Sequence, residues 1–118
     1  MRMFTEVSAV YLHRAPVDFR QSINGLSAIV EGAMNLAPFS GAVFVFCNRR
    51  RDKLKVLYWD QSGFALWYKR LEEARFQWPR SWPEAVIELH EEQLQWLLAG
   101  YDITRLRPHE SVQYSRVL

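Results

Sequence analysis

The chain has 118 residues, of which 49% are hydrophobic and 24% charged, so it fits one globular domain and is too short for two. A net charge of +2 excludes a polycation, and a single cysteine excludes an internal disulfide and a multi-cysteine zinc site. No apolar run is typical of a signal peptide or reaches the ~20 residues of a membrane span, so we expect a cytoplasmic protein without a membrane partner.

Basic side chains are concentrated in the first two thirds of the chain. Residues 1–83 carry 12 basic and 7 acidic side chains, whereas residues 84–118 carry 3 and 6. The segment 42–83 alone holds 9 basic and 4 acidic side chains. This asymmetry indicates a mildly basic local surface, which would attract anionic partners.

The first predicted elements are a strand and a helix. Residues 7–12 are typical of a short strand. Apolar residues within 23–34 then recur at helical spacing, which predicts an amphipathic helix. Asp18 and Gln21 resemble a capping box at its start, and Pro38 disfavours helical angles in the preceding residue, so the helix ends before it.

Short apolar and aromatic runs separated by turns predict a series of strands. Residues 42–47 are apolar on both faces, as in a central strand. A polar connection at 48–52 and a tight turn at 60–63 follow. The other predicted strands are 53–59, 64–70, 75–78 and 86–89.

The remaining chain predicts a second helix and a tail. Leucines share one face of residues 90–99, and Gly100 stands where a C-terminal cap belongs. Because the connections between the later strands are short, we expect an α+β domain over residues 1–107, with an antiparallel β-meander sheet of about five strands and two helices. Residues 108–118 are predicted to form a loosely ordered tail.

Strand alternation predicts that charges gather at one end of a hairpin. If Trp59 pairs with Phe64 across the turn, side chains at every second position share a face. The pairs expected farther along that face are Lys55 with Tyr68 and Lys53 with Arg70.

Three consecutive arginines precede this hairpin and approach its basic end. Like charges opposite each other destabilise a sheet, unless a bound anion or nearby carboxylates neutralise them. Two interpretations are therefore open: the charges bind a nucleic-acid backbone, or they keep a solvated hairpin soluble. The candidate nucleic-acid-binding residues are Arg49, Arg50, Arg51, Lys53, Lys55, Tyr68 and Arg70.

The tryptophans also allow two interpretations. The side chains of Trp59, Trp67, Trp78 and Tyr68 could stack on bases of a single strand or pack in the core. For Trp67 we favour the core. Trp82 lies between Pro79 and Pro83, and we expect it to be exposed and to contact a protein partner.

No motif of a known catalytic or metal site is present, so we expect neither an enzyme, a cofactor nor a metal. The three histidines are scattered, and HEEQL lacks the second histidine of a zinc protease. Cys47 lies in an apolar run and is interpreted as a buried hydrophobe. A magnesium-dependent nuclease would need converging carboxylates, but each candidate has a local structural interpretation. These candidates are Asp18, Asp52, Asp60 and Asp102.

Three segments occur in a characteristic order: VDFRQSINGLSAIV, PFSGAVFVFCNRRRDKLKVLYWD and GFALWYKRLEEARFQWP. From about Val10 to Arg107 the chain closely resembles the TnpB accessory proteins of the bacterial insertion-sequence group numbered sixty-six, the products of its second open reading frame. These differ from the RNA-guided nucleases that share the TnpB label. The resemblance implies a role in DNA transposition beside a separate transposase and other proteins of the same element, and it supplies no catalytic residue.

Charge pattern and resemblance together predict a non-catalytic accessory protein of transposition that binds DNA through the basic hairpin. The alternative is a protein-interaction module that docks onto the transposase without touching DNA. In that case Trp82 and the acidic residues around the last helix would contact the partner.

Overall fold

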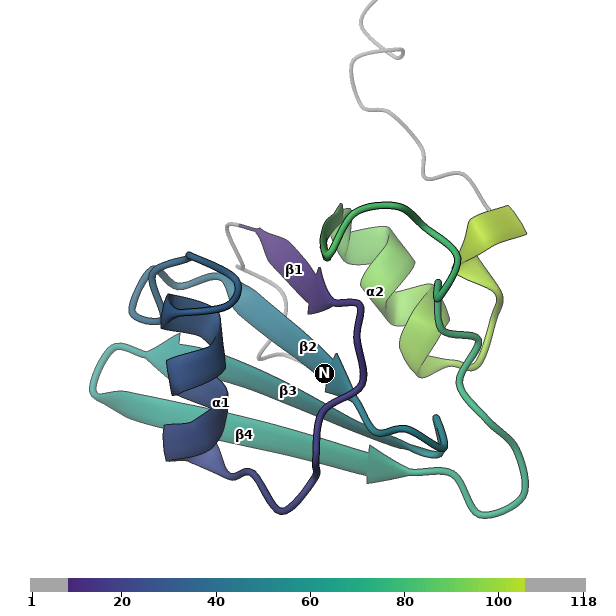
Figure 1. The fold of residues 1–118 in the computed structure, drawn as a ribbon, viewed down its shortest axis with the longest axis horizontal. Coiled ribbons are helices and arrows are strands. Elements are labelled where there is room, and N and C mark those ends of the chain that lie inside the picture. Colours follow the sequence, from purple (N-terminus) through teal and green to yellow (C-terminus); the bar gives the residue numbers. More distant parts are fainter. Residues whose placement is uncertain (1–8, 106–118) are drawn as a thin grey trace, which may run out of the picture.

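Five strands form one mixed sheet in a computed structural model of the protein, which describes residues 9–105 (Figure 1). Two α-helices and one 3-10 helix complete the described fold, which is α+β as predicted. In chain order the elements are β1 (Val10–His13), α1 (Ile23–Glu31), β2 (Val43–Cys47), β3 (Lys53–Asp60), β4 (Gly63–Arg70), β5 (Val86–Leu89), α2 (Glu91–Leu98) and η2 (Ile103–Arg105).

The sheet is not a pure antiparallel meander, and that part of the prediction is wrong. Its strand order is β4-β3-β2-β1-β5, and β1 runs parallel to β2, with Val10 beside Val43. The other neighbouring pairs are antiparallel. A parallel pair needs a long crossover connection, and the segment from β1 to β2 supplies one because it contains α1. The short connections between the later strands gave no sign of this crossover.

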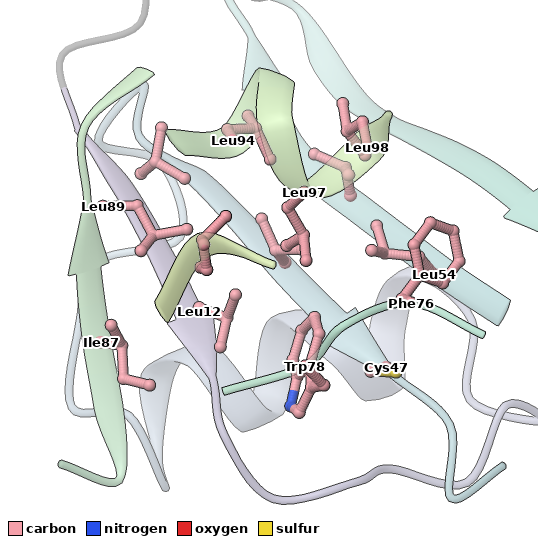
Figure 2. Close-up of a cluster of buried hydrophobic side chains, with 14 of the residues drawn as sticks. Leu12, Cys47, Leu54, Phe76, Trp78, Ile87, Leu89, Leu94, Leu97 and Leu98 are labelled. Atoms are coloured by element: carbon pink, nitrogen blue, oxygen red, sulfur yellow. The ribbon is translucent and has the colours of Figure 1, made fainter. Parts of the chain in front are cut away.

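The two helices cover opposite faces of the sheet. Alternate residues of β2 divide between the faces, so all five of its residues are buried and its predicted central position is confirmed. Phe44 and Phe46 pack with Leu26 and Val30 of α1, which Figure 1 shows lying across β3 and β4. The opposite face packs against the leucines of α2 (Figure 2).

The first helix begins later and ends earlier than predicted. Its N-terminal cap is Ser22, and the carboxylate of Asp18 instead accepts hydrogen bonds from the backbone N–H and guanidinium of Arg20. The capping-box prediction for Asp18 and Gln21 is therefore wrong. Asn35 has a φ of 54°, a left-handed angle that reverses the chain after the helix well before Pro38.

Residues 75–78 form an anchored loop, so the strand predicted there is wrong. Phe76 and Trp78 insert into the same core cluster as the leucines of α2 (Figure 2). Trp78 Nε1 donates a hydrogen bond to the carbonyl of Arg14 at 2.7 Å. Burial of every second side chain in a loop produces the same sequence alternation as a strand, and the pattern alone does not separate them.

The C-terminal elements match the prediction closely. Helix α2 lies within the predicted 90–99, and Gly100 has a φ of 95° with its N–H donating to the carbonyl of Leu97. Ile103 extends the core beyond the helix. The tail predicted for 108–118 lies outside the described residues. Within residues 9–105, no helix has the length and apolar character required to cross a bilayer.

Cys47 ends β2 and is 1% exposed, as expected for a buried hydrophobe. Burial raises the pKa of its thiol to about 12. Because the thiolate is the reactive form, we expect no reaction of the native protein with a thiol-specific disulfide reagent at pH 8. The denatured chain should react completely, with one thiol per chain. Rapid labelling of the native protein would show that β2 is not packed as described.

Candidate nucleic-acid interface

The hairpin of β3 and β4 has the predicted register. Trp59 pairs with Phe64, Lys55 with Tyr68 and Lys53 with Arg70. The side chains at these positions lie on the face that carries α1, and the apolar members near the turn pack against that helix's cluster. The basic end of the hairpin therefore extends beyond the α1 core.

The turn that carries the arginines is fixed by its own side chains. Asn48 Nδ2 donates to Asp52 Oδ1 at 2.7 Å, and Asn48 Oδ1 accepts from the N–H of Lys53 at 3.0 Å. The first of these bonds is the main cause of the lowered pKa of Asp52. Asp52 is thus held by an amide at the base of the turn, and it forms no ion pair with the arginines beside it.

The segment after β4 holds the same turn from its other side. The N–H groups of Leu71 and Phe76 each donate at 2.7 Å, to the carbonyls of Asp52 and Arg51. Arg75 Nε donates to the carbonyl of Arg50 at 2.9 Å. These contacts fix the backbone of the arginine turn while the side chains of Arg49 and Arg50 stay exposed.

An open groove of about 630 Å³ lies between this turn and the segment that leads from β1 to α1. Figure 1 shows that segment passing beside the β2–β3 turn, and the N–H of Val17 donates to the carbonyl of Cys47 at 2.9 Å. The residues that line the groove are Pro16, Val17, Asp18, Phe19, Arg20, Asn48, Arg49, Arg50 and Lys53.

The groove carries an excess of positive charge. Asp18, whose pKa is lowered to about 2 by hydrogen bonds from Arg20, forms an ion pair with that arginine and neutralises it. Arg49, Arg50 and Lys53 have no carboxylate within ion-pair distance in the described part of the chain. Three of the predicted contact residues thus meet in one groove without an ion-pair partner among the described residues.

Arg51 lies at a neighbouring surface hollow of about 430 Å³, which Arg50 also lines. This hollow contains acidic as well as basic groups, namely Asp52, Glu72, Glu73 and Arg75. Arg70 pairs with Glu72 at 2.8 Å, and both side chains are exposed. The predicted basic surface is therefore continuous through Arg50. Glu72 offsets a charge beside the second hollow, whereas Arg49, Arg50 and Lys53 in the first groove have no ion-pair partner among the described residues.

Lys55 has a structural role that its sequence position did not indicate. Its Nζ donates to the carbonyls of Phe19 and Gln21, at 2.9 and 2.7 Å, and lies 4.8 Å from the centre of the Phe19 ring. Partial burial, followed by the charge of Lys53, lowers the pKa of this ammonium group. Two of its three N–H groups are committed to the groove wall, so we leave Lys55 out of the proposed phosphate contacts.

We expect Lys55→Met to lower the free energy of unfolding by about 1–2 kcal/mol, because two partly exposed carbonyls lose a charged donor while the aliphatic stem is kept. Urea unfolding measures this change. Lys53→Met is the matched control, since that ammonium group has no hydrogen-bond partner among the described residues. We expect its effect to stay within about 0.5 kcal/mol. Equal stabilities of the two variants would contradict the role assigned to Lys55.

Tyr68 is one of the exposed large aromatic side chains, at 50% exposure. Its ring lies 6.4 Å from that of Phe19, at an interplanar angle of 59°. Phe19 belongs to the groove wall, and it was missed in the sequence because the segment around it has neither helical nor strand periodicity. The contact joins Tyr68 to the groove.

The prediction that Trp82 is exposed is wrong. Its side chain is half-buried against the core cluster that includes α2, and its carbonyl accepts a hydrogen bond from Arg14 Nη1 at 2.6 Å. Trp67 packs against the same cluster, as predicted. Sequence reasoning missed two exposed aromatic residues, Phe39 and Tyr101, each 60% exposed; Phe39 contacts Trp59 edge-on at 4.9 Å.

Possible metal ligands do not gather in the described chain. Between residues 9 and 105, no three side chains of His, Cys, Asp or Glu lie close enough together to hold an ion.

Residues 8–108 match the family described as IS66 Orf2 like protein. The uncharacterized protein y4jC of Sinorhizobium fredii is 40% identical over 92 residues, which cover 78% of each chain. A second uncharacterized protein of that organism, y4hO, is 36% identical over 93 residues, covering 79% of this chain and 80% of the relative. No solved structure matches the chain significantly. The match covers the whole of the described fold, so the chain belongs to the IS66 Orf2-like family, which implies an accessory role in insertion-sequence transposition.

Proposed function

We propose that the protein is a non-catalytic accessory factor of transposition that binds DNA phosphates in the groove between residues 16–20 and 48–53. Family membership supports a role in transposition, and the groove supports binding of DNA. The observation that carries the proposal is the set of three unpaired cations in one concave surface, Arg49, Arg50 and Lys53.

The same cations argue for an anionic ligand on energetic grounds. Lys53 stands directly opposite Arg70 in the hairpin, and like charges in that arrangement repel each other. Glu72 pairs with Arg70, and Asp52 attracts Arg50 and Lys53 without forming an ion pair with either, so these carboxylates offset part of the repulsion. A phosphate in the groove would offset the charge that remains on Arg49, Arg50 and Lys53.

The backbone of the turn supports the same interpretation. Arg51 has a φ of 62°, and its N–H donates to the carbonyl of Asn48 at 3.1 Å. Glycine or asparagine is favoured at such a left-handed turn position, because other side chains are strained there. Arg51 lines the neighbouring hollow and not the groove, so what its left-handed angle contributes to the proposal is a fixed turn that presents Arg49 and Arg50.

Fluorescence anisotropy with labelled DNA from the ends of an insertion sequence tests the proposal. Three phosphate contacts to a single strand should make the affinity fall about 20-fold between 50 and 200 mM salt. A duplex should show at least as steep a dependence per contact. Absence of binding at the lower salt concentration would refute the proposal.

The alternative function is docking onto the transposase, and one observation favours it. Phe39 lies exposed against Trp59 and Phe64, at ring distances of 4.9 and 5.3 Å, so three aromatic side chains form a surface cluster. Exposed apolar clusters of this kind often mark protein contacts. Co-purification with transposase that is lost in Phe39→Ala but survives loss of Arg49 and Arg50 would favour docking over DNA binding.

A further inference from the structure

We infer that the groove binds single-stranded DNA in preference to duplex DNA, a step that rests on the proposed function. Two independent features of the site carry the inference. One is the size and shape of the basic groove, and the other is an aromatic surface at its edge.

The groove has the dimensions of a site for a flexible strand. Its volume of about 630 Å³ is within the range of small-ligand sites, which is about 300–1,000 Å³. A duplex is a wide convex cylinder, so it would touch the rims of such a groove without filling it. A single strand can place one or two nucleotides inside, where the guanidinium groups of Arg49 and Arg50 and the ammonium group of Lys53 reach its phosphates.

The aromatic surface begins in the groove wall and continues outward. Phe19 lines the groove, and its ring contacts that of Tyr68, which is half exposed. On the sheet, Tyr68 is on the same face as Lys53 and Arg70, which pair at the next position of that face. A strand whose phosphates lie in the groove would therefore carry its bases past Tyr68.

The Phe19 end of the aromatic surface is fixed before any ligand binds. The Lys55 ammonium group holds the carbonyl of Phe19 and lies over its ring, so the position of this residue is set from the sheet side. An ordered ring is a better stacking partner than a mobile one, because binding then orders fewer groups. Bases become available for such stacking only when they are unstacked, as in a single strand.

The test compares a labelled single strand of mixed sequence with the duplex of the same length, at 50 mM salt, for the wild type, Tyr68→Ala and Tyr68→Phe. We expect the wild type to bind the single strand at least about tenfold more tightly. Tyr68→Ala should remove about a factor of ten from single-strand affinity and leave duplex affinity within about twofold. Tyr68→Phe keeps the ring and should retain most of the single-strand affinity.

The outcomes separate this inference from the proposed function. Equal or tighter binding of the duplex by the wild type would overturn the single-strand preference and leave phosphate binding in place. Unchanged single-strand affinity in Tyr68→Ala, with its fold verified by circular dichroism, would overturn the stacking role. If neither DNA binds to the wild type, the proposed function itself fails.

Discussion

The variant Arg49→Ala/Arg50→Ala/Lys53→Ala is expected to lose about two orders of magnitude in affinity for single-stranded DNA at 50 mM salt. The three side chains line one groove and have no carboxylate partners among the described residues, so each is available to a phosphate. Each lost contact removes about 0.7 from the slope of log affinity against log salt. The slope should therefore fall by about 2 in the triple variant.

A control variant separates local contacts from overall charge. Arg80 and Arg105 are exposed cations that do not line the groove, and Arg105 pairs with Asp102. Replacing both by alanine should leave the slope nearly unchanged. An equal loss of slope per charge in the control and in the triple variant would mean that the groove has no special role.

Phe76→Ala is expected to lower the free energy of unfolding by about 3–5 kcal/mol, because a fully buried ring leaves a cavity in the core. Total stabilities of such domains are about 5–15 kcal/mol, so this is a large fraction. Urea unfolding followed by tryptophan fluorescence measures the change. Phe39→Ala, at a position 60% exposed, should cost less than about 1 kcal/mol.

Loss of Phe76 should also weaken DNA binding under conditions where the variant is folded. Its N–H holds the carbonyl of Arg51, and its neighbour Arg75 holds that of Arg50. Without the buried ring, residues 75–78 hold the arginine turn less firmly. Binding must then order the turn, which costs entropy. If Phe76→Ala lowered the free energy of unfolding by less than about 1 kcal/mol, residues 75–78 would not be part of the core.

Local pattern was sufficient to predict the hairpin. The turn at 60–63 fixes the pairing of Trp59 with Phe64, and strand alternation then determines every partner as far as Lys53 and Arg70. Helix α2 could be predicted equally well, because its leucines recur at helical spacing and Gly100 ends it. In these elements the information lies within a few residues of the structure that it determines.

Long-range contacts were not available from the same patterns. The parallel pairing of β1 with β2 depends on α1 packing back onto the sheet, and the groove depends on Val17 reaching Cys47, 30 positions away. Lys55 was predicted to bind phosphate because the sequence did not reveal its two carbonyl partners, which lie in a segment without helical or strand periodicity. Trp82 looked exposed because its flanking prolines indicate a loop, but this loop packs against the core.

The most direct test of DNA binding in the groove is an NMR titration of the isotope-labelled protein with a single strand, followed through backbone amide shifts. The largest shifts are expected at residues 16–20 and 48–53, with further shifts at Tyr68 and Arg70 and little change in α2. Shifts confined to α2 and to the surface around Phe39, or no shifts at all at low salt, would contradict binding in the groove.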